Sequence, residues 1–237
     1  MATEPYAELA ELAGGFIHEI KNHLSTLGLN LQLLAEDFQQ PQNQRERRAL
    51  DRVQRLQSEC QRLVDVSNDF LRFARVKDLE LAPANLVRVI EELIDFFLPL
   101  ARQSGIEIKS FLPADLPTVA LNTEMFRQAL LNLMLNAQQA MPEGGQLIIQ
   151  ASKGPAGVDL FLIDTGKGMN AEAVSKAFRP FFSTKPGGTG LGLATTRKVV
   201  EAHGGAIAIQ SEPERGTKVS IHLPLSSPAG EPARAIA

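Results

Sequence analysis

A histidine with a carboxylate and an amide close by stands near the start of the chain, in the run HEIKN. The apolar spacing around it predicts a helix, on which His18 and Asn22 lie one turn apart on the same face. An imidazole is a usable nucleophile near neutral pH, and a neighbouring carboxylate, Glu19, can take the proton of its other nitrogen. The amide of Asn22 could orient a water molecule for a reverse or hydrolytic step. The run permits nucleophilic chemistry at His18, although a histidine beside a glutamate on a helix is more often a solvated polar pair.

Two asparagines four residues apart occupy one face of a second expected helix, residues 123–141. These are Asn132 and Asn136. Amide oxygens are hard ligands that can complete the coordination of a hydrated Mg²⁺, which also binds nucleotide phosphates. Taken alone, Asn132 and Asn136 could contact metal and phosphate in this way, but caps or polar contacts within the protein explain two such asparagines equally simply.

Two glycine-containing segments follow along the chain. The run DTGKG, residues 164–168, comes directly after an apolar strand, where the carboxylate of Asp164 can accept the adenine amino proton. Residues 178–194, FRPFFSTKPGGTGLGLA, place free amides at a helix start, where the helix dipole favours phosphate. Lys185 adds a mobile positive charge. The glycines do not match a Walker A pattern, because no Gly-Lys-Ser/Thr ends the run.

Two regimes of composition must position these side chains. Over residues 4–77, apolar residues recur at steps of three and four, and the polar segment around Pro41 breaks the pattern. This spacing predicts two long helices joined by a short loop. Because a lone hairpin cannot bury both apolar stripes, two copies would form a four-helix bundle, and we predict a homodimer.

The rest of the chain predicts an α/β two-layer sandwich. The expected elements are helices over 85–104, 123–141 and 191–203, and strands over 106–111, 146–151, 158–163, 206–211 and 217–223. Helices interleaved with a mostly antiparallel sheet are typical of that architecture. We interpret His203 and His222 as ordinary surface or strand-end residues.

Composition excludes several classes of protein. With 24 Lys and Arg against 27 Asp and Glu, the net charge of −3 argues against a nucleic-acid partner. The single cysteine, Cys60, excludes an internal disulfide and a Cys-rich zinc site. No apolar run approaches the roughly 20 residues of a membrane span, and the acidic N-terminus lacks the order of a signal peptide. We expect a cytoplasmic protein without a membrane segment.

Each motif alone has an ordinary structural explanation, but together they resemble the sensor histidine kinases of two-component systems. HEIKN resembles the phosphoacceptor box, NLMLNA the N box, DTGKGM the G1 box, FRPFF the F box and GTGLGLA the G2 box. The resemblance covers about residues 5–225, is greatest to the cytoplasmic transmitter portion, and favours the nitrogen-regulation branch. It implies a helical hairpin forming a dimeric four-helix bundle at 1–80, a hinge at 81–85, a Bergerat-type (GHKL) α/β sandwich at 86–225 and a disordered tail at 226–237.

The resemblance also implies an activity and a role for each matching residue. The chain would transfer the γ-phosphoryl group of ATP to His18, with Glu19 as base, and pass it to an aspartate of a response-regulator receiver domain. Asn22 would support phosphatase activity on that regulator. The residues expected to bind ATP and Mg²⁺, the first two through the metal, are Asn132, Asn136, Asp164, Gly166, Gly168, Lys185, Gly188, Thr189, Gly190, Leu191 and Gly192. Few residues precede the first helix, so sensor input is expected from a missing domain or another protein.

Two positions depart from the family pattern. His23 stands where most relatives have proline, and we assign phosphorylation to His18 because Glu19 follows it. Gln139 replaces a basic residue of many relatives, so one phosphate contact is expected to be missing. Three other functions remain open: a GHKL-type ATPase or serine kinase, a phosphatase-dominant or pseudokinase scaffold, and a structural coiled-coil adaptor.

Overall fold

The structure is a computed structural model with two units. It describes residues 4–76, 79–154, 156–185 and 188–225, without the side chains of residues 4–16, His18 and Arg75. The helical unit comprises the chain up to Arg75 together with Lys185–Leu191, and the α/β unit comprises Val76–Thr184 and the chain from Gly192 onward. The expected tail, 226–237, lies outside the described residues.

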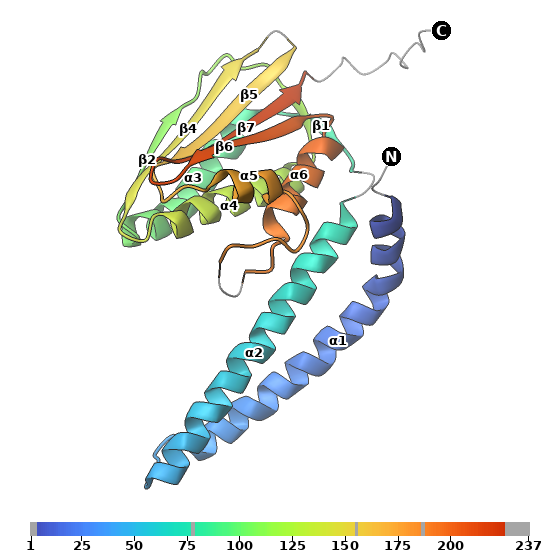
Figure 1. The fold of residues 1–237 in the computed structure, drawn as a ribbon. Helices are drawn as coiled ribbons and strands as arrows, with labels where there is room; N and C mark the ends of the chain where they lie inside the picture. Colours follow the sequence, from blue (N-terminus) through green and yellow to red (C-terminus); the bar gives the residue numbers. More distant parts are fainter. Residues whose placement is uncertain (1–3, 77–78, 155, 186–187, 226–237) are drawn as a thin grey trace. The chain divides into compact units, whose positions relative to one another are not determined.

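The helical unit is an antiparallel hairpin of two long helices, α1 (Glu4–Asp37) and α2 (Gln44–Arg75) (Figure 1). The turn ends in a reciprocal cap. The Asn43 side-chain oxygen accepts the backbone N–H of Glu46 at 3.0 Å, and the Glu46 carboxylate accepts that of Gln42 at 2.6 Å. Such a cap satisfies donors that the first turn of a helix leaves without partners, and it fixes where α2 begins.

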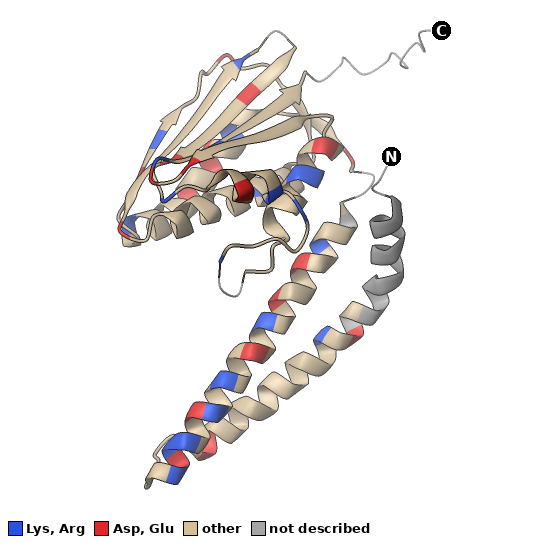
Figure 2. Cartoon of the chain, in the orientation of Figure 1, with Lys and Arg blue, Asp and Glu red and all other residues tan. Residues whose placement is uncertain are grey.

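Apolar and charged side chains are distributed unevenly over the hairpin. Charged residues are dense on α2, whereas residues 22–35 of α1 contain no Asp, Glu, Lys or Arg (Figure 2). Val53 and Phe73 are buried in the described part of the hairpin. Its exposed large apolar residues are Leu27, Leu29, Leu33, Leu34, Leu56, Leu63 and Val66. Much of the apolar surface of the described part of the hairpin is therefore exposed in one copy of the chain.

The α/β unit is built around a five-stranded sheet of order β2-β4-β5-β7-β6. Its strands are β2 (Ile106–Phe111), β4 (Gly145–Lys153), β5 (Gly157–Asp164), β6 (Ala206–Glu212) and β7 (Gly216–Pro224). Neighbouring strands are antiparallel except β2 and β4, which are parallel. A separate two-stranded sheet pairs β1 (Ala82–Ala84) with β3 (Val119–Leu121).

Helices cover one face of the sheet (Figure 1). They are α3 (Leu86–Gln103), α4 (Thr123–Ala140) and α6 (Gly192–Ala202), and a short helix, α5 (Ala171–Lys176), precedes α6. Apolar side chains from α3, α4 and α6 form one core with alternate residues of the strands, including Phe97, Phe126, Leu160 and Ile221. Burial of these residues against each other supplies the main drive for folding of this unit.

The expected fold class is confirmed, with a helical N-terminal region followed by a mixed α/β sheet domain. The five predicted strands and three predicted helices of the α/β unit are present, with ends that differ by at most two residues. The short elements α5, β1 and β3 were not predicted. The predicted hinge at 81–85 coincides with β1 and stays a prediction. Of the helices in the described part of the chain, none combines the length and apolarity needed to cross a bilayer.

The interpretation of His203 as a surface residue is wrong. Its side chain is buried, with 3% of the residue exposed. Burial is possible because both ring nitrogens have hydrogen-bond partners, one on Val199 and one on Asn122. His222 lies near the end of β7, half-exposed, with its Nδ1 2.8 Å from the carboxylate of Asp159 on β5.

Candidate functional site

Helix α4 carries the asparagine pair. Asn122 caps its start, since the side-chain oxygen accepts the backbone N–H of Met125 at 3.1 Å. Phe126 and other apolar residues hold the opposite face of the helix in the core. Asn132 and Asn136 therefore lie one turn apart, both half-buried, on a helix whose position is fixed by its cap and its core face.

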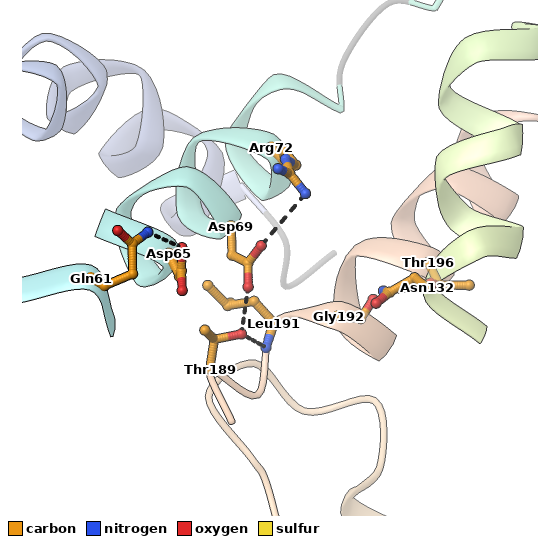
Figure 3. Close-up of polar contacts among 9 residues, drawn as sticks. All are labelled: Gln61, Asp65, Asp69, Arg72, Asn132, Thr189, Leu191, Gly192 and Thr196. Atoms are coloured by element: carbon orange, nitrogen blue, oxygen red, sulfur yellow. Dashed lines mark hydrogen bonds and ion pairs between the residues drawn. The ribbon is translucent and has the colours of Figure 1, made fainter. Parts of the chain in front are cut away.

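The start of α6 meets this pair at Asn132. The Asn132 side-chain NH₂ donates to the Thr196 hydroxyl at 3.3 Å, and that hydroxyl donates to the Gly192 carbonyl at 3.0 Å. A Cβ at Gly192 would lie 2.8 Å from the Asn132 side-chain nitrogen, so this position accepts only glycine without a shift. Figure 3 shows the three residues together. The structure thus brings together two predicted site residues, Asn132 and Gly192, that lie 60 positions apart in the sequence.

The end of α4 meets the turn that follows β5. The Lys167 backbone N–H donates to the Ala140 carbonyl at 3.0 Å, and a Cβ at Gly166 would lie 2.6 Å from that same oxygen. Ala140 is one helical turn beyond Asn136. Helix α4 therefore joins three of the predicted motifs: its own asparagines, the start of α6 and the turn at residues 164–168.

Asp164 ends β5 with 8% of the residue exposed. Its Oδ1 accepts the backbone N–H of Gly166 at 2.9 Å and that of Thr217 at 3.2 Å. Hydrogen bonds from backbone N–H groups stabilise a carboxylate in a buried position and fix its direction. Thr217 was not among the predicted site residues. The only signal for it is the start of the last strand at Gly216, since the pairing of β5 with β7 sets Thr217 opposite Asp164.

Two predicted glycines, Gly166 and Gly168, have structural reasons to be glycine. Gly168 has φ +62°, and a Cβ there would lie 1.9 Å from the Glu212 carbonyl oxygen. Gly166 lies against Ala140 as described above. Both residues thus permit close approach of protein backbone, and their predicted part in shaping a nucleotide pocket stays a prediction.

The glycine-rich residues 188–191 belong to the helical unit. The Thr189 hydroxyl donates to the Asp69 carboxylate at 2.7 Å and accepts the Leu191 N–H at 3.3 Å (Figure 3). Arg72 lies 3.8 Å from the other Asp69 oxygen. Asp69 was missed because its position on α2 gives no sequence signal. The predicted roles of Lys185, Gly188, Thr189, Gly190 and Leu191 in ATP binding stay predictions.

The histidine motif lies on α1. His18 falls within this helix, but its side chain lies outside the described residues. Glu19, Asn22 and His23 are exposed to solvent. The predicted roles of His18 as phosphoacceptor, Glu19 as base and Asn22 in phosphatase activity stay predictions.

The asparagine side chains of α4 suit a metal ion that binds together with nucleotide phosphates. Within the described residues, no group of three or more His, Cys, Asp or Glu could hold a metal ion. Mg²⁺ usually keeps several waters and binds proteins through one or two oxygen ligands together with substrate phosphates. The amide oxygens of Asn132 and Asn136 suit that mode, and the absence of a side chain at Gly192 leaves the Asn132 amide room beside the start of α6.

Comparison with known proteins places the chain in a family. Residues 122–227 match the histidine kinase-, DNA gyrase B- and HSP90-like ATPases. The chain is 32% identical over 229 residues to the sensor histidine kinase ZraS of Escherichia coli (strain K12), covering 97% of this chain and 48% of ZraS. It thus spans about half the length of the curated relatives that it matches.

Solved structures give the same answer. The catalytic domain of the histidine kinase ThkA is 30% identical with a TM-score of 0.57, over 62% of this chain and 96% of that domain. Full-length ShkA in complex with AMPPNP is 29% identical with a TM-score of 0.70, over 97% of this chain and 47% of ShkA. The motifs, the sheet domain with its α4 framework, and these similarities agree: the chain belongs to the family of sensor histidine kinases.

Proposed function

We propose that the chain is an ATP-dependent histidine autokinase that phosphorylates His18 and passes the phosphoryl group to an aspartate of a response-regulator receiver domain. The observation that carries the proposal is the position of α4. Its asparagine pair lies between the start of α6, at Gly192, and the turn after β5, at Gly166. Amide oxygens, a glycine-rich helix start and a buried carboxylate are the groups that phosphates, Mg²⁺ and adenine require.

Each part of the site has a task in this reaction. Asp164, held by two backbone N–H groups, accepts the adenine amino proton and orients the base. Asn132 and Asn136 bind the phosphates and Mg²⁺, and the glycine-rich residues 188–191 with Lys185 bind and cover the phosphates. When bound, Mg²⁺ supplies neutralisation of the phosphate charge. Phosphoryl transfer depends mostly on such positioning and charge stabilisation, so no protein nucleophile is needed beyond the acceptor.

The acceptor chemistry takes place on α1. The unprotonated ring nitrogen of His18 bonds to the γ-phosphorus, and the bond from that phosphorus to the bridging oxygen breaks, so ADP leaves with the oxygen. Glu19 takes the proton of the other ring nitrogen. The aspartate carboxylate of the receiver domain then bonds to this phosphorus, the bond between phosphorus and the His18 nitrogen breaks, and the imidazole leaves and takes back the proton from Glu19. Asn22 orients water for dephosphorylation of the regulator, and bending at 81–85 permits the catalytic unit to approach α1.

The hairpin acts as a homodimer in this proposal. Seven large apolar side chains of the described hairpin are exposed in one copy, and a second hairpin in a four-helix bundle would cover such a stripe. Burial of apolar surface would then drive association of the two copies. The cytoplasmic location and the input from a missing domain or another protein stay predictions.

Labelling with γ-³²P-ATP and Mg²⁺ tests the proposal. Wild type, His18→Gln and His23→Gln are compared, and the label is tested for stability in acid and in alkali. A label that survives alkali, is lost in acid and disappears only in His18→Gln supports the proposal. Transfer of this label to an added receiver domain tests the second step.

Other outcomes of this experiment identify the alternatives. Label lost only in His23→Gln would move the acceptor to His23. An acid-stable label would indicate a GHKL-type serine kinase, and binding of ATP without any label would indicate a phosphatase-dominant or pseudokinase scaffold. Absence of ATP binding would leave the structural adaptor.

A further inference from the structure

His203 is a buried polar residue for which the proposed reaction has no use. It follows the end of α6, and its residue exposure is 3%. Its Nδ1 is 2.7 Å from the Val199 carbonyl oxygen, and its Nε2 is 3.0 Å from the backbone nitrogen of Asn122. Its ring packs against that of Phe126 in a T-shaped arrangement, with the ring centroids 5.6 Å apart and the planes at 61°.

These partners define the proton on the ring. A carbonyl oxygen only accepts, so Nδ1 donates to Val199, and a backbone N–H only donates, so Nε2 accepts from Asn122. The buried imidazole is therefore neutral with its hydrogen on Nδ1. It satisfies an acceptor on one helix and a donor at the start of another, which few other side chains can do at once.

His203 thus links the end of α6 to the start of α4. Asn122 is the N-cap of α4, and Val199 lies in the last turn of α6. A second link joins the two helices further along, where Asn132 donates to Thr196 and faces Gly192. The helices are antiparallel between these links, which are separated by about 15 Å along α4, at a rise of about 1.5 Å per residue.

Two links at this separation fix the sliding and rotation of α6 along α4. The contact of Gly192 with Asn132 needs that precision, because the Asn132 side chain occupies the space that a Cβ at Gly192 would need. The Val199 carbonyl would keep the backbone N–H of His203 as a partner, but the backbone N–H of Asn122 would lose its acceptor. A packed helix pair without the His203 link could adjust its register by small displacements to satisfy Asn122 elsewhere. Such displacements would carry Gly192 away from Asn132.

We propose that His203 is a positioning residue for nucleotide binding, which holds the start of α6 in register with the Asn132–Asn136 face of α4. The inference rests on the proposed function, because it assumes that ATP binds at this face. His203 itself is linked to the site only through the two helices. Its loss should weaken the binding of ATP more than it slows phosphorylation at saturating ATP.

The test compares two substitutions in the full chain. His203→Phe keeps a ring against Phe126 but removes both hydrogen bonds, whereas His203→Gln offers an amide that can donate to Val199 and accept from Asn122. Binding of a non-hydrolysable ATP analogue is measured by calorimetry, and KM for ATP and kcat by autophosphorylation. We expect His203→Phe to weaken binding about tenfold, because the helix register that binds ATP would then be only a fraction of the population. Its kcat should change less than its KM, and His203→Gln should restore most of the affinity.

A matched control separates positioning from general destabilisation. Val158→Ala removes core volume from β5 at the end of the strand opposite Asp164, and its melting temperature is compared with that of His203→Phe. Wild-type affinity in Val158→Ala together with weak binding in His203→Phe supports the proposal. Equal losses in the two variants, or wild-type affinity in His203→Phe, would overturn it.

Two further outcomes of this experiment bear on the proposal. If His203→Phe does not fold, His203→Asn takes its place, because its shorter amide can reach only one of the two partners, and the same weakening is expected. If the wild type itself does not bind the analogue, the proposed function fails first, and the role of His203 in nucleotide binding fails with it.

Discussion

The helical unit and the α/β unit bury their apolar residues to very different extents. In the α/β unit, one core joins three helices to the inner face of the sheet, and residues such as Phe126 and Leu160 are fully enclosed. Within the described hairpin, Val53 and Phe73 are the large apolar side chains that one copy buries, while seven others are exposed. The α/β unit buries its apolar residues within itself, whereas the described hairpin leaves much of its apolar surface exposed in one copy.

The largest expected effect tests the self-sufficiency of the α/β unit. Phe126→Ala should lower the free energy of unfolding by about 3–5 kcal/mol, because it leaves a cavity in the core. The loss should be the same at low and high protein concentration, as measured by urea unfolding at both. Phe96→Ala is the control, since Phe96 on α3 is 72% exposed and its removal should change stability little. A loss in Phe126→Ala that depended on protein concentration would contradict the comparison.

The second prediction tests the dependence of the hairpin on a partner. The double variant Leu27→Gln, Leu34→Gln replaces two exposed leucines of the α1 stripe and should weaken dimerisation by about 2–4 kcal/mol over the two copies. Analytical ultracentrifugation measures the change, because the double variant should dissociate to monomers at a higher protein concentration than the wild type. Leu81→Gln, an exposed leucine outside both helices, should leave the dimer unchanged. An unaltered dimer in the double variant would place the interface elsewhere.

Asp164→Asn tests whether the α/β unit contains the adenine site. The amide keeps an oxygen to accept the N–H groups of Gly166 and Thr217 but loses the charge and the acceptor for adenine. ATP affinity should fall about tenfold or more, with the melting temperature nearly unchanged. The control, Asp159→Asn on the same strand, removes a carboxylate that pairs with His222 and should bind ATP normally. Equal affinity in wild type and Asp164→Asn would remove this residue from the site.

A smaller effect is expected at Asp69, which binds the glycine-rich residues within the helical unit. Asp69→Asn replaces the charged acceptor of the Thr189 hydroxyl, 2.7 Å away, by a neutral one, so residues 188–191 should be held less firmly and be freer to bind phosphates. We expect ATP affinity to rise about two- to threefold, in the range of an exposed charge interaction. Asp65→Asn, one turn earlier on α2, contacts Gln61 instead and should have no effect (Figure 3). A weaker affinity in Asp69→Asn would show that its charge supports nucleotide binding.

The smallest expected effect lies on the surface of the α/β unit. The hydrogen bond from Arg88 lowers the pKa of Glu92 below its usual value, and Arg127 acts in the same direction. Because the folded-state pKa is the lower one, this stabilisation is present above the unfolded-state pKa and is lost as pH falls through the folded-state pKa. Carbon-detected NMR titration should show the Glu92 pKa rising in Arg88→Ala. An unchanged Glu92 pKa would assign the shift to Arg127.

Long periodic elements could be predicted from the sequence because the spacing of their apolar residues indicates which face is buried. In β4, Leu147 and Ile149 alternate with less buried neighbours, and in α4 the apolar positions recur every three or four residues. The segments 82–84 and 171–176 are too short to show a period. Their structure depends on pairing with β3 and on the Asn170 cap.

Contacts between distant residues were harder to predict. Asn132, Asn136 and Asp164 were identified by residue type and spacing, but the approach of Gly192 to Asn132 depends on how α6 packs on α4. Thr217 reaches Asp164 only through the register of β5 and β7. In the sequence, His203 is only a polar residue that follows a helix. Its second hydrogen-bond partner, Asn122, lies 81 positions earlier.

The glycine at position 168 bears on how such domains are detected by sequence surveys. A descendant of this chain that no longer bound ATP would still need glycine at position 168, because any side chain there would collide with the carbonyl oxygen of Glu212. Selection for a foldable turn would thus preserve the DTGKG signature long after selection for catalysis had ceased. A survey that separates active from degenerate members should therefore weigh Asn132, Asn136 and Asp164, and give the glycines of this turn little credit.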